Sequence, residues 1–397
     1  MGGRWLAGPL VVGWRSPGTS PGLTKGLRMN NRPSCRTAAA AFVSLWFGSA
    51  ASAQSCVADI TGNRVVDGSD LANVLAQWGP CGPRESCSAD TNDDGVVNGV
   101  DLGNVLAAWG LCPVTVPGWA TLIEAYPNPA VVHDASLRAS IVATGYAWRV
   151  RDTSTQIELV LIPPGTFQMG CSASNLYTCG PWESPVHTVS LTNAFYMGRY
   201  EVTQAQWTAR MGSNPSSFQS PSAQVPADQV SSRPVERVSW NMIQGFLSDT
   251  GMRLPTEAEW EYAYRAGTST AFHSMPGYPS GTNDDAQIGL IEWIFTGSCT
   301  SGAACQTRPV GRLAGNGFGL HDMGGNVQEW VNDWYSASYY ASSPPVNPLG
   351  PSSGSHRVLR GSSWDSFQSM YSRSSQRMYA VPSNNYLLLG FRVARSP

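Results

Sequence analysis

The sequence predicts two parts of different kinds: a small all-α pair of loop–helix units at residues 54–112, and a larger domain at 156–397 in which short helices and strands are separated by long loops. Three observations support this prediction. The chain repeats itself after 31 residues (87 − 56), so that residues 87–112 match residues 56–81. Few later segments carry a helix or strand pattern. Gly (41) and Pro (28) are abundant, as is typical of a chain rich in turns and loops.

The composition excludes several classes of protein. Hydrophobic residues make 42% of the chain and charged residues 13%, with 15 Trp, so a buried core is expected rather than a disordered chain. The formal net charge of -2 provides no basic surface. Nucleic acid is therefore not an expected partner.

The first 53 residues have the order of a secretory signal. Arg32 and Arg36 precede an apolar stretch at 37–53 that closes on small residues, which is typical of a cleaved signal peptide. The stretch is too short for a membrane-spanning helix, which needs about 20 apolar residues. We predict that residues 1–53 are the signal region, with Met29 as the true start. The mature chain is then exported, whether extracellular, periplasmic or at the cell surface, and has no membrane span.

The cysteines favour an oxidising compartment. Cys35 falls in the signal region, and the other eight of the nine form sequence-adjacent pairs, which favours disulfides. Zinc is the alternative, but the chain has no Cys-x-x-Cys and its five His are scattered, without ligand spacing. The predicted disulfide cysteines are Cys56, Cys81, Cys87, Cys112, Cys171, Cys179, Cys299 and Cys305.

The second copy of the repeat has the pattern of a calcium-binding loop. Carboxylates and amides alternate as in an EF-hand-type loop, and Gly95 stands at position 6, where such a loop turns sharply. Calcium takes six to eight oxygen ligands, which this spacing supplies from one short segment. A solvated turn rich in Asp and Asn is the alternative interpretation. The predicted ligands are Asp90, Asn92, Asp94, Val96, Asn98 and Asp101.

The first copy keeps most of this pattern but lacks the glycine. Arg64 stands at position 6 and the uncharged Asn63 at position 5, so we predict weaker calcium binding there. The candidate ligands are Asp59, Thr61, Asn63, Val65, Asp67 and Asp70. A short amphipathic helix follows each loop, and we expect its apolar stripe to be buried against the other copy or a neighbour. The two stripes are Leu71, Val74, Leu75 and Trp78, and Leu102, Val105, Leu106 and Trp109.

A loop followed by one helix, with Asp at position 12 and a duplicate beside it, resembles the type I dockerin module. The resemblance covers residues 56–112 and implies calcium-dependent folding and a surface that docks a protein partner, typically a cohesin domain. Loop positions 10 and 11, which carry recognition in that family, are Gly68-Ser69 and Gly99-Val100. They differ between the copies and do not identify the partner. The bracketing cysteines depart from the usual pattern and suggest that one disulfide staples each unit, Cys56 to Cys81 and Cys87 to Cys112.

The remaining chain divides into a connector and a domain of about 240 residues. Residues 113–155 are punctuated by Pro and are predicted to be a connector with one short helix around Asp134 to Ala143. In the domain at 156–397, long ordered loops are expected between short elements. The predicted elements are helices after capping boxes at Thr203 with Gln206 and Thr256 with Glu259, a helix from Ser239 to Gly251, and strands at 158–162 and 186–191.

Seven ordered motifs of this domain resemble the sulfatase-modifying factor family. The resemblance implies the fold of the formylglycine-generating enzyme, a mixed α+β domain related to C-type lectins with little regular secondary structure. The motifs are IPPGTFQMG (162–170), YMGRYEVTQAQW (196–207), PVERVSW (234–240), MRLPTEAEWEYAYRAG (252–267), GFGLHDMGGNVQEWVNDWY (317–335), RVLRGSSW (357–364) and LGFRVAR (389–395).

The same resemblance implies a chemistry that this chain has lost. Active members oxidise a substrate cysteine in a Cys-x-Pro-x-Arg setting to formylglycine, using copper(I), oxygen and two cysteines after the Gly-Gly-Ser-aromatic motif. Here Ser366 takes the position of the first cysteine, the second falls near Tyr371, and no cysteine follows Cys305. A hydroxyl cannot replace a thiolate toward copper(I), so copper is not expected. Ser363, Trp364, Tyr371 and Gln328 would line the remnant cleft. Met370, Ser366 and His356 are conceivable substitute ligands, although such groups more often pack or are solvated.

The family's structural calcium site is expected to survive. The resemblance places its ligands at Asp322, Met323, Gly325 and Val327, through one side-chain oxygen and several backbone carbonyls. The alternative is an acid that approaches a helix N-terminus. A second family site should lie near 284–293 but cannot be aligned.

Other catalytic patterns are missing from the sequence. The Trp-rich motifs suggest a sugar-binding platform, but aromatic residues in such motifs more often fill the core. Glu257, Glu259 and Glu261 share a helix, and no second carboxylate is placed opposite them as acid–base catalysis requires. Neither a nucleophile elbow nor a phosphate-binding loop is present.

Three functional hypotheses follow. The first is an exported binding protein of the family that is calcium-stabilised, lacks the copper cysteines and docks a partner through the duplicated module. The second is an active enzyme, either a formylglycine generator with unusual ligands or a related oxygen-dependent oxidoreductase. The third is a component of a polysaccharide-degrading assembly that contributes only anchoring. The ligand or protein bound by the C-terminal domain is not indicated by the sequence.

Overall fold

The computed structural model describes residues 56–82, 87–171, 177–294, 305–366 and 368–397. The predicted signal region at 1–53, with Met29, lies outside the described residues. Among the residues that are described, no helix is long and apolar enough to cross a membrane.

The module at 56–112 consists of two loop–helix units, and both predicted helices are confirmed. Each helix begins at a capping box, formed by Asp67 with Asp70 in the first unit and by Asn98 with Asp101 in the second. In each helix the acid at the third position accepts the backbone N–H of the N-cap residue, while the N-cap side chain accepts an N–H of the first turn. The free N–H groups at the helix start thereby find partners. The elements are β1 (Val65–Val66), α1 (Gly68–Ala76), β2 (Gly79–Pro80), β3 (Val96–Val97), α2 (Gly99–Ala107) and β4 (Gly110–Leu111).

The short strands of each loop–helix unit pair with those of the other unit, and for this reason the predicted disulfide pairing is wrong. β1 of the first loop pairs with β4 after the second helix, and β2 after the first helix pairs with β3 of the second loop. The start of each unit therefore lies beside the end of the other. The disulfides are Cys56–Cys112 and Cys81–Cys87, in place of the expected Cys56–Cys81 and Cys87–Cys112.

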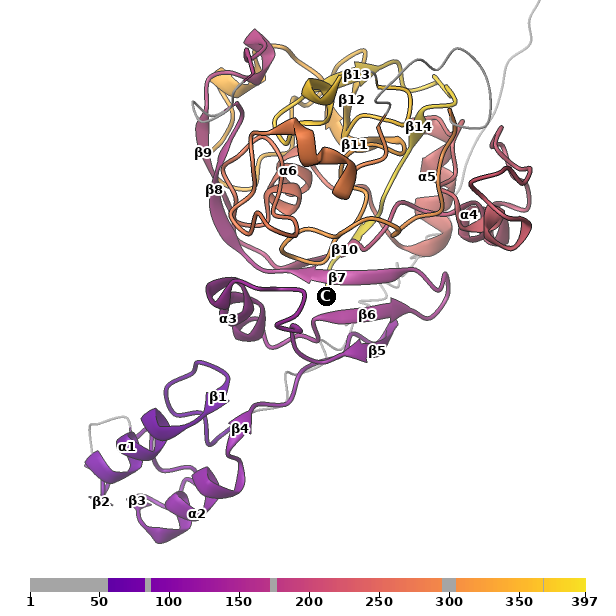
Figure 1. Cartoon of the computed structure of the whole chain (residues 1–397). Helices are drawn as coiled ribbons and strands as arrows, with labels where there is room; N and C mark the ends of the chain where they lie inside the picture. The colour runs from indigo at the N-terminus through magenta and orange to yellow at the C-terminus, as the bar shows by residue number, and fades with distance from the viewer. Residues whose placement is uncertain (1–55, 83–86, 172–176, 295–304, 367) are drawn as a thin grey trace, which may run out of the picture. The chain divides into compact units, whose positions relative to one another are not determined.

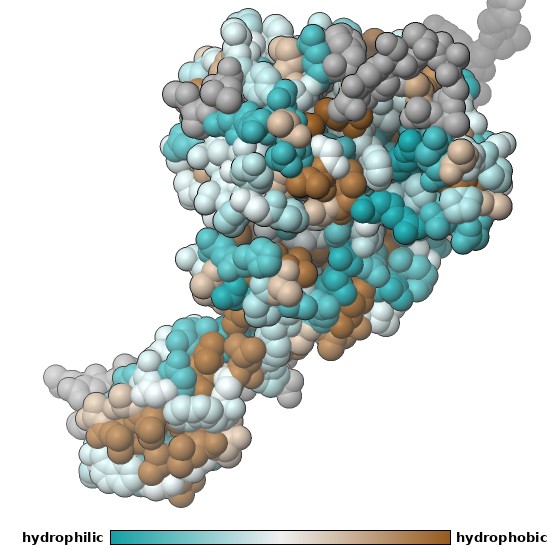
Figure 2. All heavy atoms as spheres, viewed as in Figure 1, coloured by the Kyte–Doolittle hydropathy of each residue, from teal (hydrophilic) through white to brown (hydrophobic). Residues whose placement is uncertain are grey.

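The apolar stripes of the two helices are only partly buried, contrary to expectation. Val74 and Val105 are fully buried in the module core. Leu75, Trp78, Leu106 and Trp109 remain 52–57% exposed, because only one side of each helix packs on the small core of the module. Apolar side chains gather accordingly on the face of the module seen in Figure 2.

Residues 113–155 add strands to the large sheet instead of forming only a connector. β5 and β6 pair with each other, and β6 pairs with β7, in a sheet of order β15-β10-β7-β6-β5. The predicted helix is confirmed as α3, which Asp134 caps. The elements are β5 (Ala120–Glu124), α3 (Ala135–Ala143), β6 (Arg149–Asp152), β7 (Glu158–Ile162), β10 (Phe195–Gly198) and β15 (Ala394–Arg395).

A second sheet and a hairpin complete the strand set of the domain. The sheet has the order β13-β12-β11-β14, with β14 parallel to β11. The strands predicted at 158–162 and 186–191 are confirmed as β7 and β9. The elements are β8 (Gly165–Met169), β9 (His187–Leu191), β11 (Gln328–Trp334), β12 (Arg357–Arg360), β13 (Met378–Ala380) and β14 (Leu389–Gly390).

The three predicted helices of the domain are also confirmed. Thr203 and Thr256 form capping boxes, and Ser239 caps a helix that ends at Gly251, whose φ of 66° is left-handed. The helices are α4 (Gln204–Met211), α5 (Trp240–Thr250) and α6 (Glu257–Arg265), with 3-10 turns η1 (Pro181–Glu183), η2 (Ala227–Ser232), η3 (Asp285–Leu290), η4 (Tyr339–Ala341) and η5 (Ser369–Ser372).

The domain core lies around α6 and the second sheet, with α6 packed against β8, β11 and β12 (Figure 1). Trp207, Trp260 and Trp330 are at most 2% exposed, so these motif tryptophans fill the core, as predicted. Trp240 and Trp334 are half-buried, and the Arg357 guanidinium lies over both rings at 3.9 and 3.5 Å from their centroids.

Candidate functional site

The turn after β12 is held in place by backbone contacts. Gly361 has a left-handed φ of 88°, and a Cβ there would lie 2.9 Å from the carbonyl oxygen of Met323, so only glycine fits. The Gly361 carbonyl accepts the N–H of Gly325 at 2.7 Å, and Trp364 donates its N–H to the Asn326 carbonyl at 2.9 Å. The turn is thereby fixed against the segment that precedes β11.

Hydroxyl groups fill the position that the sequence resemblance assigns to the first copper cysteine. Ser366 is 9% exposed, and its Oγ accepts the hydroxyl of Ser362 at 2.6 Å and the N–H of Ser363 at 3.3 Å. Trp364 stands edge-on to Phe218, with ring centroids 5.3 Å apart. Ser366 therefore shares one turn with two of the predicted cleft residues, Ser363 and Trp364, and the groups that contact its hydroxyl are neutral.

The other two predicted cleft residues do not complete a cavity with this turn. Tyr371 lies in η5 and is half-buried. Gln328 begins β11 and donates its side-chain amide to the Met378 sulfur. Gln328 lines a cavity on the second sheet, and Ser363, Ser366 and Tyr371 are not among the residues that line it.

The described cysteines provide no thiolate. Cys171 and Cys179 form the predicted disulfide. Cys305 is disulfide-bonded, and its predicted partner Cys299 lies outside the described residues. Copper(I) requires soft sulfur ligands, so the groups around Ser366 do not fit that ion.

Asp322 has the unsatisfied oxygen that a calcium ligand would have. The residue is 1% exposed, and one carboxylate oxygen accepts the N–H of Gly311 at 2.6 Å. The other, Oδ1, is buried with no hydrogen-bond partner in the described part of the chain. Burial raises the pKa of Asp322 to about 6. A hard cation at Oδ1 would supply the missing partner.

Two further buried acids lie near Asp322. Glu329 is paired with Arg392 at 2.6 Å. Glu201 accepts N–H groups from Asn326 and Val327 at 2.7 and 3.0 Å, and burial, together with the charge of Asp322, raises its pKa well above the usual value. The sequence analysis did not single out Glu201, although a lone acid inside the motif YMGRYEVTQAQW was the available signal.

Any metal site must also use amide or carbonyl oxygens. In the described ranges, no three His, Cys, Asp or Glu side chains are grouped so that they could hold a metal ion. The Asp322 site, with one carboxylate and backbone carbonyls, is compatible with this finding, whereas the two loops, each predicted to use three aspartates, show no such grouping and stay predictions. Met323, Gly325 and Val327 would contribute carbonyl oxygens beside Asp322, and this assignment stays a prediction.

Both repeat loops adopt one backbone conformation. In the second copy, Asp90 accepts the N–H groups of Asp94 and Gly95 at 3.1 and 2.7 Å. In the first, Asp59 accepts those of Asn63 and Arg64 at 3.0 and 2.7 Å. Carboxylates that face the loop interior in this way are suited to calcium.

The position-12 acids of both loops are buried and ionised. Asp70 and Asp101 are 0% exposed. Burial alone would raise their pKa values, but N–H and hydroxyl hydrogen bonds from Asp67 and Thr61, and from Asn98 and Thr91, outweigh it and lower them. Both loops therefore keep a negative charge at the position where calcium needs it.

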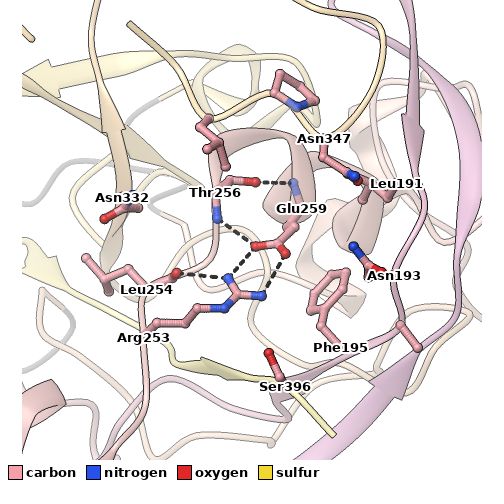
Figure 3. A pocket seen from close by; sticks show the side chains of 13 residues that line it. Leu191, Asn193, Phe195, Arg253, Leu254, Thr256, Glu259, Asn332, Asn347 and Ser396 are labelled. Atoms are coloured by element: carbon pink, nitrogen blue, oxygen red, sulfur yellow. Dashed lines mark hydrogen bonds and ion pairs between the residues drawn. The ribbon is translucent and has the colours of Figure 1, made fainter. Parts of the chain in front are cut away.

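A pocket beside β10 has one carboxylate in its lining, that of Glu259, and this carboxylate is paired. Glu259 accepts both guanidinium arms of Arg253 at 2.6 and 2.7 Å and the N–H of Thr256 at 2.8 Å, as Figure 3 shows. Its neighbours Glu257 and Glu261 are 2% and 0% exposed and bound to arginines. None of the three is available for acid–base chemistry, in agreement with the sequence analysis.

The cavity beside Gln328 is lined by aromatic side chains from several elements. Its volume is about 610 Å³, within the range of small-molecule sites. The sequence analysis missed it, because its walls come from segments far apart in the chain. We call it the tyrosine pocket; its lining residues are Trp182, Gln328, Tyr335, Ala337, Leu359, Gln376, Arg377, Met378, Tyr379, Ala380, Tyr386, Leu388 and Leu389.

Comparisons with known proteins agree with this geometry. The family model described as "Sulfatase-modifying factor enzyme 1-like domain" matches residues 147–397. The formylglycine-generating enzyme of Streptomyces coelicolor is 33% identical in an alignment of 302 positions that covers 64% of this chain and 94% of that protein. Among solved structures, Treponema denticola variable protein 1 has 29% sequence identity and a TM-score of 0.51, and the match covers 62% of this chain and 98% of that chain. PvdO from Pseudomonas aeruginosa has 28% identity and a TM-score of 0.51, and the match covers 63% of this chain and 98% of that chain.

Proposed function

This chain belongs to the sulfatase-modifying factor family, whose domain spans residues 147–397, and from this premise we propose that it is a non-oxidising binding protein of that family. It is exported, is stabilised by calcium, and carries a docking module at residues 56–112. Copper has no role in this proposal. Family membership alone does not decide between binding and catalysis, so the proposal depends on the site.

The observation that carries the proposal is the cluster of hydrogen-bonded serines around Ser366, which contains no thiol. Active members need a thiolate at this position, as both metal ligand and redox partner of the substrate thiol. Here Ser366 accepts hydrogen bonds from Ser362 and Ser363, and a hydroxyl at neutral pH is neither a copper(I) ligand nor a redox group.

Calcium would supply the partner that the Asp322 carboxylate lacks in the domain, and it would bind the oxygen atoms of the two loops in the module. The unpartnered Oδ1 of Asp322 supports the first site. The inward-facing Asp90 and Asp101 support the second. The left-handed φ of 67° at Arg64, a residue with a side chain, supports a weaker third site, since this conformation is strained for any residue but glycine.

Docking is supported by equivalent exposed side chains in the two copies. Leu75 in α1 and Trp78 just after it correspond to Leu106 in α2 and Trp109 just after it by the 31-residue shift (106 − 75 and 109 − 78), and all four are exposed. Large apolar side chains exposed in matched positions mark an interaction surface. A cohesin-like domain is the partner that the dockerin resemblance suggests, and three disulfides support export.

The test is incubation of the mature chain with copper(I), oxygen and a Cys-x-Pro-x-Arg peptide. Mass spectrometry would detect formylglycine, with the Streptomyces coelicolor enzyme as positive control and a copper-free reaction as blank. We expect no product above the blank. Product that depends on copper would refute the proposal.

The alternative is an active formylglycine generator or a related oxygen-dependent oxidoreductase. The observation in its favour is the 33% identity to the Streptomyces coelicolor enzyme over 94% of that protein's length. The same incubation separates the two functions. A role as the anchoring component of a polysaccharide-degrading assembly would be supported by capture of a cohesin domain in calcium and release in chelator.

A further inference from the structure

We infer that the tyrosine pocket binds a neutral carbohydrate chain, an inference that rests on the proposed binding function and names its ligand class. The pocket lies on β13 and β11 of the second sheet, and its volume of about 610 Å³ suits a ligand larger than a metal ion or a water cluster.

Flat aromatic faces form its wall and rim. Tyr335 and Tyr379 stack with ring centroids 4.1 Å apart and an interplanar angle of 25°. Tyr335 covers one face of Tyr379, and His356 stands edge-on to that ring with centroids 5.1 Å apart. Tyr379 and Tyr386 are nevertheless 52% and 58% exposed, so part of each ring is accessible to a ligand. The C–H face of a sugar ring is flat and weakly apolar, and it packs well on such rings.

The pocket offers no free charge, which argues against an ionic ligand. Arg377 is the only charged residue among those that line it. Its Nε and Nη2 donate to Glu257 at 2.7 and 2.8 Å, and its Nη1 donates to the carbonyls of Trp182 and Ser336 at 2.9 and 3.2 Å. A phosphate, sulfate or carboxylate would therefore find the guanidinium neutralised and fully bonded.

Unused polar groups in the wall match hydroxyls. The hydroxyls of Tyr335 and Tyr379 make no hydrogen bond with any described residue. A tyrosine hydroxyl and the amide of Gln328 both donate and accept, as sugar hydroxyls do, whereas a proline-rich peptide offers only carbonyl acceptors.

The experiment is isothermal titration calorimetry of the full mature chain in calcium. The neutral probes are cellohexaose, xylohexaose, mannohexaose and chitohexaose. A heparin-derived hexasaccharide tests charge, and a proline-rich decapeptide tests the peptide alternative. We expect at least one neutral hexasaccharide to bind and the charged one to bind no more tightly. Failure of all four neutral probes, or tighter binding of the charged sugar or the peptide, would overturn the inference.

Variants locate the binding. Tyr379→Ala is expected to weaken it about tenfold through loss of a stacking face, whereas Tyr379→Phe keeps the face and should weaken it less. Tyr386→Ala, at the more exposed ring, provides a second test if the first variant disturbs Tyr335. The matched control is Asn193→Ala in the pocket of Figure 3, which should bind as the parent does. If Tyr379→Ala and Tyr386→Ala both bind the sugar as tightly as the parent does, the sugar binds elsewhere and the proposed site is refuted.

Failure of this inference is distinguishable from failure of the proposed function. If no neutral sugar binds and no formylglycine forms, the pocket assignment is wrong and the non-oxidising role stands. If formylglycine forms in the copper reaction, the proposed function is wrong whatever the titrations show.

Discussion

At the scale of single residues, position 6 of the repeat shows how backbone conformation limits sequence. Gly95 and Arg64 stand at equivalent positions and have left-handed φ values of 85° and 67°. A side chain in this conformation costs about 1–2 kcal/mol. The first copy therefore carries strain that the second avoids, which is the physical reason to expect weaker calcium binding in the first.

We predict that Gly95→Ala lowers the free energy of unfolding of the module by about 1 kcal/mol. A Cβ at this glycine would meet no atom within 4 Å, so the loss measures conformation and not crowding. Hydrogen exchange of residues 87–112 would report it.

The control is Gly103→Ala in the interior of α2, where the Cβ also meets nothing within 4 Å. That change should raise stability by about 0.5–1 kcal/mol, because alanine is the better helix former. If both variants change the free energy of unfolding in the same direction, the left-handed turn at Gly95 is assigned wrongly.

Asp333 gives the domain a pH dependence. Burial raises its pKa to about 8 from the usual 3.8, and the charges of Glu257 and Glu259 add to the rise, while the N–H of Glu257 and the charge of Arg377 oppose it. Between about pH 4 and pH 8, Asp333 therefore holds a proton in the folded chain that it has already released in the unfolded chain. Its contribution to stability is present below pH 4 and is lost as the pH rises to about 8.

We predict that Asp333→Asn removes this loss. Asparagine is neutral throughout and can still accept the N–H that Glu257 donates to Asp333 at 2.8 Å. Between pH 5 and pH 8 the variant should gain about 1–3 kcal/mol relative to the parent, as measured by urea unfolding of both chains at each pH. A difference that does not change with pH would show that Asp333 does not titrate in this range.

At the scale of elements, the sequence predicted what is local and missed what is not. The starts of α4, α5 and α6 follow from capping residues within one turn, and all three predictions were correct. The strands β1 to β4 have two residues each and exist only because the two copies exchange ends. Likewise, β5 and β6 become recognisable only through their pairing with each other and with β7. The tyrosine pocket was missed for the same reason, because Trp182 and Tyr379 are far apart in the chain.

The exchanged ends predict the order of disulfide contributions. Cys56–Cys112 closes a loop with a sequence separation of 56, and Cys81–Cys87 one of 6. The loop-closure relation gives about 4 kcal/mol for the first and about 2.4 kcal/mol for the second. We therefore expect the double serine variant of Cys56 and Cys112 to lose more stability than that of Cys81 and Cys87. Peptide mapping without reductant should recover the same two pairs, and a Cys56–Cys81 peptide would refute the exchange.

At the scale of the whole molecule, buried ion pairs join segments that are distant in sequence. Glu257 binds Arg377 at 2.7 Å, Glu261 binds Arg360 at 2.6 Å, and Glu183 binds Arg373 at 2.9 Å. The side chains of all six are at most 2% exposed. These pairs hold the loops after β12 against α6 and η1 in a domain with short strands. They also fix Arg377, and with it one wall of the tyrosine pocket.

We predict that Glu257→Gln lowers the free energy of unfolding by about 3–5 kcal/mol, because it leaves the buried charge of Arg377 without its partner. Glu259→Gln is the matched control on the same helix. Its partner Arg253 is 39% exposed, and glutamine can still accept the Thr256 N–H of the capping box, so the loss should stay within about 1 kcal/mol. Urea unfolding of both variants in calcium measures the difference. Equal losses would show that the buried pair of Glu257 with Arg377 contributes no more to stability than the partly exposed pair of Glu259 with Arg253.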